Sequence, residues 1–553
     1  MAMQRYDAVI VGSGACGGWA AMQLAQAGFK VALLEAGSQI VPYKEFRHRW
    51  PYELPFRGAG QPGLLRKYFP GATEFNYRIM IDDRDNPYTT PPDQPFRWIR
   101  SRVLGGRTLH WSRASDRMSD LEFKAASRDG YGEDWPIAYG DIARYYDRVE
   151  RLIGVSAAAA NLPQFPDGVF LPPMPLNCSE TIFQAACGKL GLACTPRRVA
   201  QLTRMWNNRP PCHYCGNCIN GCDVGAMFNS IAVTLPPALK TGNVTLLCDS
   251  VASHVLMNDE NRACGIRYIE RFTQRRVEIG GKIVILAGSS LENTRLLLNS
   301  DKGGLANSSG VLGQYLMDQV GGAGVTGFLP PLKGTRIRND DGKLGGLYIP
   351  NFSNLGPRSG SGKFIRGYSM SASGGAAQFP MFAPGLPGFG SAYKKEVKRL
   401  YPAHARVWLS GGEMLARKEN FVELDPVERD KWGIPVLKIH CTHCDNDRAI
   451  YRAFFDRATE IFRAAGGEIF HSAPSMSVPG ALIHEVGTSR MGADPKTSVL
   501  NSFCQTHDIP NLFVFGGGCF VSTGDKHPTL TMMALTARGC DYLIDRARKG
   551  ELA

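Results

Sequence analysis

The chain lacks any run of about 18 uninterrupted apolar residues, the length that a membrane-spanning helix needs. We therefore do not expect an integral membrane protein. The first residues, MAMQRYDAVIVGSG, lead straight into an apolar segment and leave no room for the charged, hydrophobic and cleavage regions of a signal peptide. We expect periplasmic export with a partner that carries the signal, with residence in the cytoplasm as the alternative.

Acidic residues are fewer than basic ones, 50 against 63, which gives a formal net charge of +13. Such an excess can favour an anionic partner, nucleic acid included. The basic residues are scattered, however, and the densest cluster, RFTQRR at 271–276, lies between two alternating apolar segments as a hairpin turn would. We expect no nucleic-acid partner.

A disulfide framework is also missing, because most of the 15 cysteines stand singly in apolar runs, where cysteine behaves as a small hydrophobic residue.

With 553 residues the chain exceeds one ordinary domain of about 100–200 residues. Two or three domains are expected.

The first 35 residues predict a strand, a helix and a second strand. YDAVIV at 6–11 is a short β-branched run, a helical pattern follows and closes on Gly28, and FKVALLE at 29–35 is again apolar. The turn between the first strand and the helix reads GSGACG. This is the unit that binds dinucleotide cofactors.

Each position of this unit has a physical role. Gly12 permits the tight turn, Gly14 lets the backbone approach a pyrophosphate, and Gly17 lets the helix pack closely on the strand. The free N–H groups at the start of the helix bind the phosphates. Glu35, at the end of the second strand, can accept hydrogen bonds from both ribose hydroxyls.

Two later segments, 277–300 and 511–543, each read as a strand, a glycine turn and a helix. A sheet assembled from such distant pieces is usual for flavin domains. Between 320 and 440, glycines and prolines separate short alternating runs, which predicts an antiparallel sheet. The expected fold class is α/β (α+β), with a Rossmann-like FAD-binding domain built from discontinuous segments and an antiparallel-sheet substrate domain.

In this order, the segments VLGGRTLHW (103–111), VILAGSSLENTRLLL, NLFVFGGG and HPTLTMMALTAR resemble the markers of the glucose-methanol-choline (GMC) oxidoreductase family. The resemblance covers nearly the whole chain. SRDGYGEDWPI at 127–137, the LPPMPL run and the cysteine segment are most similar to the catalytic subunits of bacterial FAD-dependent sugar dehydrogenases, glucoside 3-dehydrogenases in particular.

The resemblance implies a division into the first part of the FAD-binding domain (1–125), an insertion with the cysteine segment (126–224), the second part of the FAD-binding domain (225–318), the substrate-binding domain (319–478) and a C-terminal part of the FAD-binding domain (479–553). It also implies FAD contacts at Gly105 and Gly106, whose bare backbone can approach the cofactor, and at Ala287 and Gly517. His110 lies in the same loop, where some relatives bond a histidine covalently to the flavin. The alternative is a histidine packed beside Trp111.

Alcohol oxidation by a flavin requires removal of a hydroxyl proton, and histidine suits that task because its pKa lies near working pH. His484 in ALIHEVGTSRMG and His527 in GDKHPTLT resemble the catalytic pair of the family. We expect His484 to be the base and His527 to hydrogen-bond the substrate oxygen.

Cys212, Cys215, Cys218 and Cys222 follow the C-x2-C-x2-C-x3-C spacing of iron–sulfur ferredoxins. Related glucose dehydrogenases hold a three-iron cluster with cysteines that match Cys212, Cys218 and Cys222, so a 3Fe-4S or a 4Fe-4S cluster is expected. Zinc and unliganded thiols remain alternatives.

The expected function is an FAD-dependent dehydrogenase that oxidises a secondary hydroxyl of a sugar or glycoside, at C3, and passes electrons through the cluster to a cytochrome-type acceptor. A small accessory subunit would carry the export signal. A roomy site is suggested by the Gly- and Pro-rich stretch 353–392, interpreted as a lid or a plain loop. The alternatives are oxidation at C1 of glucose, dehydrogenation of gluconate or sorbitol, and an FAD and iron–sulfur electron-transfer hub.

Overall fold

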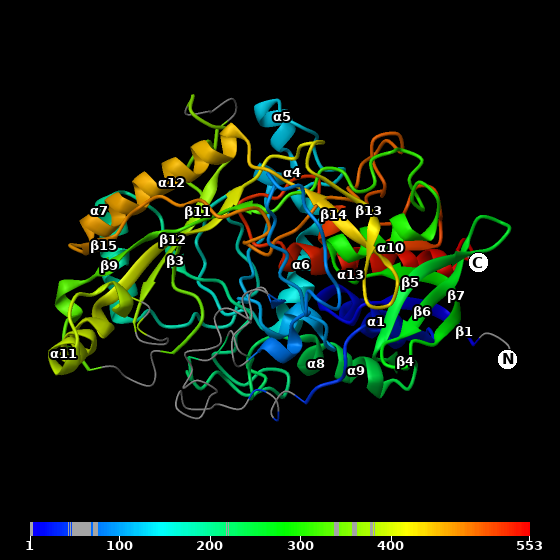
Figure 1. The fold of residues 1–553 in the computed structure, drawn as a ribbon, viewed down its shortest axis with the longest axis horizontal. Coiled ribbons are helices and arrows are strands. Elements are labelled where there is room, and N and C mark those ends of the chain that lie inside the picture. The colour runs from blue at the N-terminus through cyan, green and yellow to red at the C-terminus, as the bar shows by residue number, and fades with distance from the viewer. Residues whose placement is uncertain are drawn as a thin grey trace.

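Two mixed layers of sheet and helix lie at opposite ends of the molecule, as Figure 1 shows. The computed structural model describes residues 4–552, except for 42–43, 45, 47–67, 70–75, 217, 219–220, 337–341, 357–361, 376–379 and 381. The chain passes several times between the two layers, so that each is built from segments far apart in sequence.

In the described part of the chain, the first sheet has seven strands. In spatial order they are β4 (Val244–Leu247), β2 (Val31–Leu34), β1 (Arg5–Val11), β7 (Arg276–Leu286), β6 (Ala263–Glu270) and β5 (Ser250–Met257), with β16 (Leu512–Val514) also beside β7. The strands β4, β2, β1, β7 and β16 run parallel, whereas β5, β6 and β7 are antiparallel. The predicted assembly from distant strands and the predicted hairpin at 271–276 are both confirmed.

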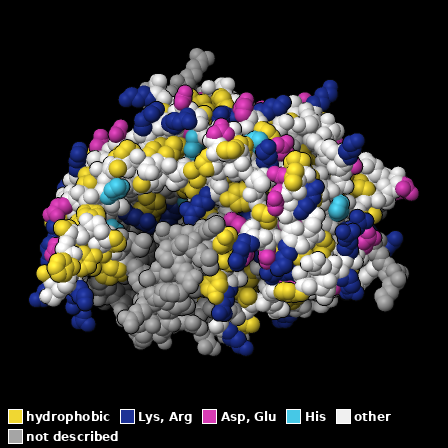
Figure 2. Space-filling view, in the orientation of Figure 1, with side chains coloured by type: hydrophobic (Ala, Val, Ile, Leu, Met, Phe, Trp, Pro, Cys, Tyr) yellow, Lys and Arg dark blue, Asp and Glu magenta, His cyan; other side chains and the backbone are white. Residues whose placement is uncertain are grey.

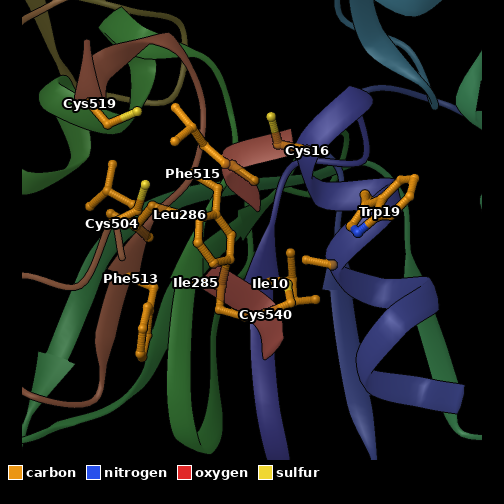
Figure 3. Close-up of a cluster of buried hydrophobic side chains, with 14 of the residues drawn as sticks. Ile10, Cys16, Trp19, Ile285, Leu286, Cys504, Phe513, Phe515, Cys519 and Cys540 are labelled. Carbon is orange, nitrogen blue, oxygen red and sulfur yellow. The ribbon is translucent and has the colours of Figure 1, made fainter. Parts of the chain in front are cut away.

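Helices cover this sheet and close its core. α1 (Ala15–Gln26) packs on α13 (Thr529–Arg548), which also contacts α6 (Tyr139–Ile153). Figure 3 shows the buried side chains between these helices and the central strands, which include Ile10, Cys16, Trp19, Ile285, Leu286, Cys504, Phe513, Phe515, Cys519 and Cys540. The parallel strands are apolar on both faces, and this explains why their sequences read as unbroken apolar runs.

The second sheet is antiparallel and also has seven strands. Their order is β15 (Glu468–His471), β9 (Val325–Phe328), β12 (His404–Glu413), β11 (Tyr368–Gly374), β10 (Leu347–Ile349) and β3 (Thr195–Pro196), with β8 (Gln319–Val320) also beside β12. On one face, α12 (Asp445–Ala464) and α7 (Cys178–Lys189) pack against the sheet. The predicted antiparallel-sheet layer is confirmed.

The remaining described elements lie outside the two seven-stranded sheets. They are the hairpin of β13 (Phe421–Arg429) and β14 (Pro435–His440), the helices α4 (Asp120–Phe123), α5 (Ala125–Asp129), α8 (Ser230–Val233), α9 (Leu235–Lys240), α10 (Ser290–Ser300) and α11 (Gly390–Leu400), and the 3₁₀ turns η3 (Tyr77–Ile79), η4 (Gly106–Leu109), η6 (Pro330–Leu332), η8 (Ala383–Gly385), η9 (Tyr401–Ala403) and η10 (Gly517–Cys519). Within the described residues, no helix is long and apolar enough to cross a membrane.

The stretch 353–392 is not one continuous loop, and this corrects the interpretation from the sequence. Residues 368–374 of this stretch form β11, a buried strand paired on both sides. The alternation in YSMSASG is a strand signal that the surrounding glycines and prolines obscured. Parts of the stretch, 357–361, 376–379 and 381, lie outside the described residues.

Candidate active site

The glycine turn after β1 leaves a protein-free space at the start of α1. Gly12 has φ +97°, a left-handed conformation that favours glycine, and a Cβ at Gly17 would lie 1.8 Å from the Gly12 carbonyl oxygen. A Cβ at Gly14 would meet no protein atom within 4 Å. Gly14 heads α1 without any side-chain cap, so the first N–H groups of the helix are available to an anion.

Glu35 lies at the end of β2, directly behind this turn. Its carboxylate accepts hydrogen bonds from the backbone N–H and the hydroxyl of Ser13 and from the N–H of Gly37. Burial raises the pKa of Glu35, and the hydrogen bond from Ser13 opposes that rise. Three donors to two carboxylate oxygens leave acceptor capacity for a ribose hydroxyl.

The 103–111 loop faces the same turn. The Gly105 N–H donates to the Ser13 hydroxyl at 2.8 Å, and a Cβ at Gly106 would come within 3.9 Å of the Gly14 Cα. Gly105 and Gly106 both have positive φ. Two stretches of bare backbone therefore border one space, which fits an elongated cofactor.

Ala287 and Gly517 lie at the ends of β7 and β16, on the same edge of the sheet as the glycine turn. The Ala287 N–H donates to the Val11 carbonyl, and a Cβ at Gly517 would lie 2.7 Å from the Ser290 hydroxyl. This is the carboxyl edge of the parallel strands, where open α/β sheets bind their ligands.

His110 is half-buried at the end of η4, and its Nε2 is in contact with the Ser101 hydroxyl. Burial lowers the pKa of His110 to about 3, and the charges of Arg113 and Arg107 act in the same direction. The ring is therefore neutral at physiological pH. Its neighbour Trp111 packs edge-on against Phe228 rather than on His110.

The structure brings His484 and His527 together from positions 43 residues apart in sequence. Their ring centroids are 4.7 Å apart and the ring planes are inclined by 76°. Both side chains are half-buried. The predicted pair thus forms one site.

Gln319, in β8, fixes the tautomer of His484. The side-chain N–H groups of Gln319 donate to the carbonyl oxygens of Gly524 and Lys526, so its Oε1 must point toward His484. That oxygen lies 2.7 Å from His484 Nδ1 and can only accept a hydrogen bond. His484 Nδ1 therefore carries the proton, and its Nε2 is left as an acceptor.

Arg197, next to β3, fixes His527 in the opposite way. Its guanidinium nitrogen lies 2.5 Å from His527 Nδ1 and can only donate, whereas the Asp116 carboxylate is farther from Nδ1, at 3.4 Å. The nearer contact makes Nδ1 the acceptor, and the neutral ring then carries its proton on Nε2. Asp116 pairs with Arg197 at 2.8 Å and holds it in place. One ring thus offers an acceptor and the other a donor.

Both histidines are neutral at physiological pH. Burial holds the pKa of His484 well below its ordinary value of 6.5, and protonation of His527 and the charges of Arg107 and Arg197 act in the same direction. Burial also lowers the pKa of His527, and so does Arg197. A neutral imidazole with a free Nε2 is the form that can take a proton.

One ion pair and two hydrogen bonds from backbone N–H groups hold the loop that carries His484. Arg107 of the 103–111 loop pairs with Glu485 at 2.7 Å, and the carboxylate of Asp318 accepts hydrogen bonds from the N–H groups of Leu482 and His484. Burial and the charge of Glu485 raise the pKa of Asp318 to about 6. The 103–111 loop and the loop that carries His484 are therefore held together.

The four cysteines of the C-x2-C-x2-C-x3-C segment lie close together. Burial raises the pKa of Cys218 to about 12, and the thiols of Cys212 and Cys215 raise it further. Cys212 Sγ accepts hydrogen bonds from the Gln201 side chain at 2.8 Å and from the Tyr214 N–H at 3.3 Å.

Among the described residues, however, the cysteines do not form a ligand set. No group of three or more His, Cys, Asp or Glu side chains in this part of the chain is arranged to hold a metal ion. The segment also includes residues 217 and 219–220, which are outside the described residues.

The fully buried Arg113 joins the cysteine segment to the 103–111 loop. Its guanidinium donates to the carbonyl oxygens of Thr108 and Leu109, at 3.1 and 2.8 Å, and to that of Cys218 at 3.5 Å. One side chain therefore spans the distance between the two regions.

Family profiles described as GMC oxidoreductase match residues 6–321 and 416–536 of the chain. The first match alone covers more than half of the sequence. The chain belongs to the GMC oxidoreductase family. It is an FAD-dependent oxidoreductase that acts on CH–OH groups.

Three relatives illustrate the range of this family. The chain is 30% identical to 2-methyl-1,2-propanediol dehydrogenase of Mycolicibacterium austroafricanum, over 98% of the chain and 95% of the relative. It is 27% identical to the fructose dehydrogenase large subunit of Gluconobacter japonicus, over 98% of each. It is 28% identical to a C-glycoside 3-oxidase of Arthrobacter globiformis, over 54% of the chain and 53% of the relative.

A solved structure supports the fold. Formate oxidase of Aspergillus oryzae superimposes with a TM-score of 0.62 over the full length of both chains, at 14% identity. At that identity the likeness concerns the fold alone.

Sequence reasoning missed four residues that organise the site of this GMC oxidoreductase: Gln319, Arg197, Asp116 and Arg107. Gln319 and Arg197 lie 165 and 330 residues from the histidines that they contact. Neither lies in a recognisable motif. Arg107 lies inside the GGRTLHW motif, and this position was the one sequence signal for any of the four residues.

Proposed function

We propose that this GMC oxidoreductase is a dehydrogenase that oxidises a secondary hydroxyl of a glycoside, at C3 of the sugar ring, to a ketone. The observation that carries the proposal is the opposite tautomeric state of two adjacent neutral histidines. A hydroxyl group needs one acceptor for its proton and one donor for its oxygen. The pair supplies one of each.

His484 is the general base in this proposal, because its Nε2 is free to accept the hydroxyl proton while Gln319 holds Nδ1–H. His527 donates its Nε2–H to the same oxygen and stabilises the alkoxide as charge develops there. Arg197 places a positive charge behind His527 and favours the same anionic oxygen. FAD, when bound along the two glycine turns, supplies the ring that accepts the hydride.

Residues that fit the FAD are those bordering the open space at the start of α1. Gly12, Gly14 and Gly17 form the pyrophosphate turn, and Glu35 faces the ribose. Gly105 and Gly106 approach from the other side, and Ala287 and Gly517 lie on the same sheet edge. His110 is proposed as a neighbour of the flavin, bonded to it or packed beside it.

Oxidation at C3 is supported by two considerations. One relative is named a C-glycoside 3-oxidase, and the motifs of this chain resemble those of glucoside 3-dehydrogenases. Oxidation at a ring carbon leaves the glycosidic bond intact, so a substrate with a substituted anomeric carbon is accepted. Oxidation at C1 requires a free anomeric hydroxyl.

Cys212, Cys215, Cys218 and Cys222 are proposed as the residues that hold an iron–sulfur cluster, of the 3Fe-4S or the 4Fe-4S type. Such a cluster, when bound, would carry single electrons away from the flavin. The link through Arg113 to the 103–111 loop supports this location. A reduced flavin that reacted directly with oxygen would have no use for such an exit, and this favours a dehydrogenase over an oxidase.

The acceptor is proposed to be a cytochrome-type carrier, and a small accessory subunit is proposed to accompany the chain to the periplasm. One relative is named a large subunit, which supports a multi-subunit assembly.

The test is to incubate the enzyme with a methyl glucoside and an electron mediator and to identify the product by NMR. A 3-keto glycoside is expected. Gluconolactone from free glucose, with no turnover of the methyl glucoside, would assign the enzyme to C1 oxidation. An electron-transfer hub would instead take electrons from a reduced protein partner, and no sugar would reduce its flavin.

A further inference from the structure

A strip of polar and aromatic side chains leads outward from the histidine pair along one face of the second sheet. On β12, Ser410 bonds to Arg197, and Trp408 and Arg406 follow at alternate positions on the same face. Val407 and Leu409, between them, point into the apolar core on the other face. At about 3.3 Å per residue, Trp408 lies about 7 Å and Arg406 about 13 Å from Ser410.

The neighbouring strands extend this strip. Ser371 and Ser373 of β11 pair with Trp408 and Arg406, and Thr326 of β9 pairs with Arg406 from the other side. Ser371 also accepts a hydrogen bond from Arg197, so the strip is continuous with the histidine site. Figure 2 shows this face hollowed over β12, with Lys and Arg side chains gathered in the hollow.

Among the described residues, the guanidinium group of Arg406 contacts an aromatic ring through its planar face and has no hydrogen-bonding partner at its edges. Its guanidinium lies over the Trp408 ring, 4.4 Å from the ring centroid. Among the described residues, neither a carboxylate nor a hydrogen-bond acceptor contacts it. The Arg406 side chain is exposed, so its N–H donors are accessible to a ligand. A stacked guanidinium presents up to five donors in one plane.

The outer end of the strip is closed by aromatic rings. His404 is the next side chain on this face of β12 and packs against Phe382, with ring centroids 5.0 Å apart and the ring planes inclined by 34°. Phe382 in turn packs edge-on against Phe328. The strip therefore has an inner end at the histidine pair, a donor-rich flat middle and an apolar outer wall.

We propose that Trp408 and Arg406 form the subsite for the second ring of a glycoside, a sugar or an aryl group attached to the sugar that is oxidised. This inference rests on the proposed glycoside substrate. Along β12, Trp408 and Arg406 lie about 7 Å and about 13 Å beyond Ser410, which bonds to the Arg197 that contacts His527. This spacing suits a ring joined to the reacting sugar. Sugar hydroxyls accept hydrogen bonds from the Arg406 donors, and the indole provides the flat surface that a ring face covers.

The test compares Arg406→Ala and Trp408→Ala with the wild type on methyl glucoside, cellobiose and 4-nitrophenyl glucoside, with a mediator as acceptor. KM for the two-ring substrates should rise at least about tenfold, whereas KM for methyl glucoside and kcat for all three should change less than about twofold. Arg406→Lys, which keeps the charge and loses the planar fork, should resemble Arg406→Ala. The control Arg276→Ala removes an exposed arginine of the other sheet and should change nothing.

An effect on cellobiose alone assigns the subsite to a sugar ring, and an effect on the nitrophenyl glucoside alone assigns it to an aryl ring. Equal changes for all three substrates, or none, overturn the inference. Calorimetric titration with both two-ring ligands separates the inference from the proposed function. If the wild type oxidised none of the substrates, weaker binding of a two-ring ligand to Arg406→Ala would still support the subsite, and unchanged binding of both would overturn it.

Discussion

The histidine pair and the cysteine segment differ in what holds them in place. Each histidine has one ring nitrogen engaged by a protein side chain that is itself fixed, Gln319 for His484 and Arg197 for His527. The cysteines approach one another, but among the described residues they do not form a metal-ligand set. The protein alone organises the first site, whereas the second would take its final geometry from the cluster that we propose it binds.

The glycine turn, like the cysteine segment, is not completed by protein contacts alone. Its defining feature is a space at Gly14 that no protein atom fills. Flavin reduction by substrate in the absence of oxygen reports on all three regions. Changes that act on the cofactor space or on the pre-formed histidines should have large effects on it, and changes in the cysteine segment small ones.

The largest effect is expected from Gly14→Val. The new side chain would occupy the space at the start of α1 without meeting protein, so the chain should fold and lose its FAD. The absorbance of the purified protein measures this directly: it should be colourless. Gly188→Val is the matched control, since a Cβ there also meets nothing within 4 Å, and it should stay yellow. Normal FAD content in Gly14→Val would contradict the cofactor assignment.

His484→Ala should slow flavin reduction by roughly 10²–10⁴-fold, because the hydroxyl proton loses its acceptor. FAD content should not change. The exposed His471, replaced by alanine, is the control and should reduce its flavin at the wild-type rate. If His527→Ala were severe and His484→Ala harmless, the two roles would be reversed.

Gln319→Leu should slow flavin reduction by about 10–100-fold, the size of effect expected when a group that orients a reacting side chain is lost. The variant frees the His484 ring to adopt the other tautomer. Gln319→Glu, which retains an acceptor for Nδ1–H, should recover part of the rate. The exposed Gln184, replaced by leucine, serves as the control. A wild-type rate of flavin reduction in Gln319→Leu would show that His484 does not depend on Gln319 to hold its tautomer.

Cys218→Ser should change flavin reduction less than about twofold, since the thiol lies outside the histidine site. Iron and acid-labile sulfide should fall to background, and electron delivery to a cytochrome-type acceptor should be lost. Cys178→Ser, at an exposed thiol, should retain its iron. Stoichiometric zinc without iron in the wild type would reject the cluster.

The smallest effect is expected from pH. The pKa of His484 lies well below 6.5, so its neutral form persists and kcat/KM should change less than about twofold between pH 8 and 6.5. A histidine with the ordinary pKa would lose half of its neutral form at pH 6.5. The unfolded chain takes up this proton and the folded chain does not, so stability should fall as pH drops below about 6.5.

The sequence predicted those parts of the molecule whose signal is local. The unit from β1 to β2, the strands at 277–286 and 512–514 and the helix that follows His527 each depend on residues a few positions apart. The histidine pair was predicted through its flanking motifs. Gln319 and Arg197 could not be predicted, because their roles exist only when β8 and β3 lie beside the loops that carry the histidines.

The central claim is that a glycoside hydroxyl is oxidised at the histidine pair, and anaerobic mixing of the enzyme with methyl glucoside tests it most directly. The flavin absorbance should bleach in the wild type, and the bleaching should be slowed by roughly 10²–10⁴-fold in His484→Ala with the same FAD content. A wild-type flavin that stays oxidised with methyl glucoside and with every other sugar, or one that bleaches equally fast in His484→Ala, would contradict the account.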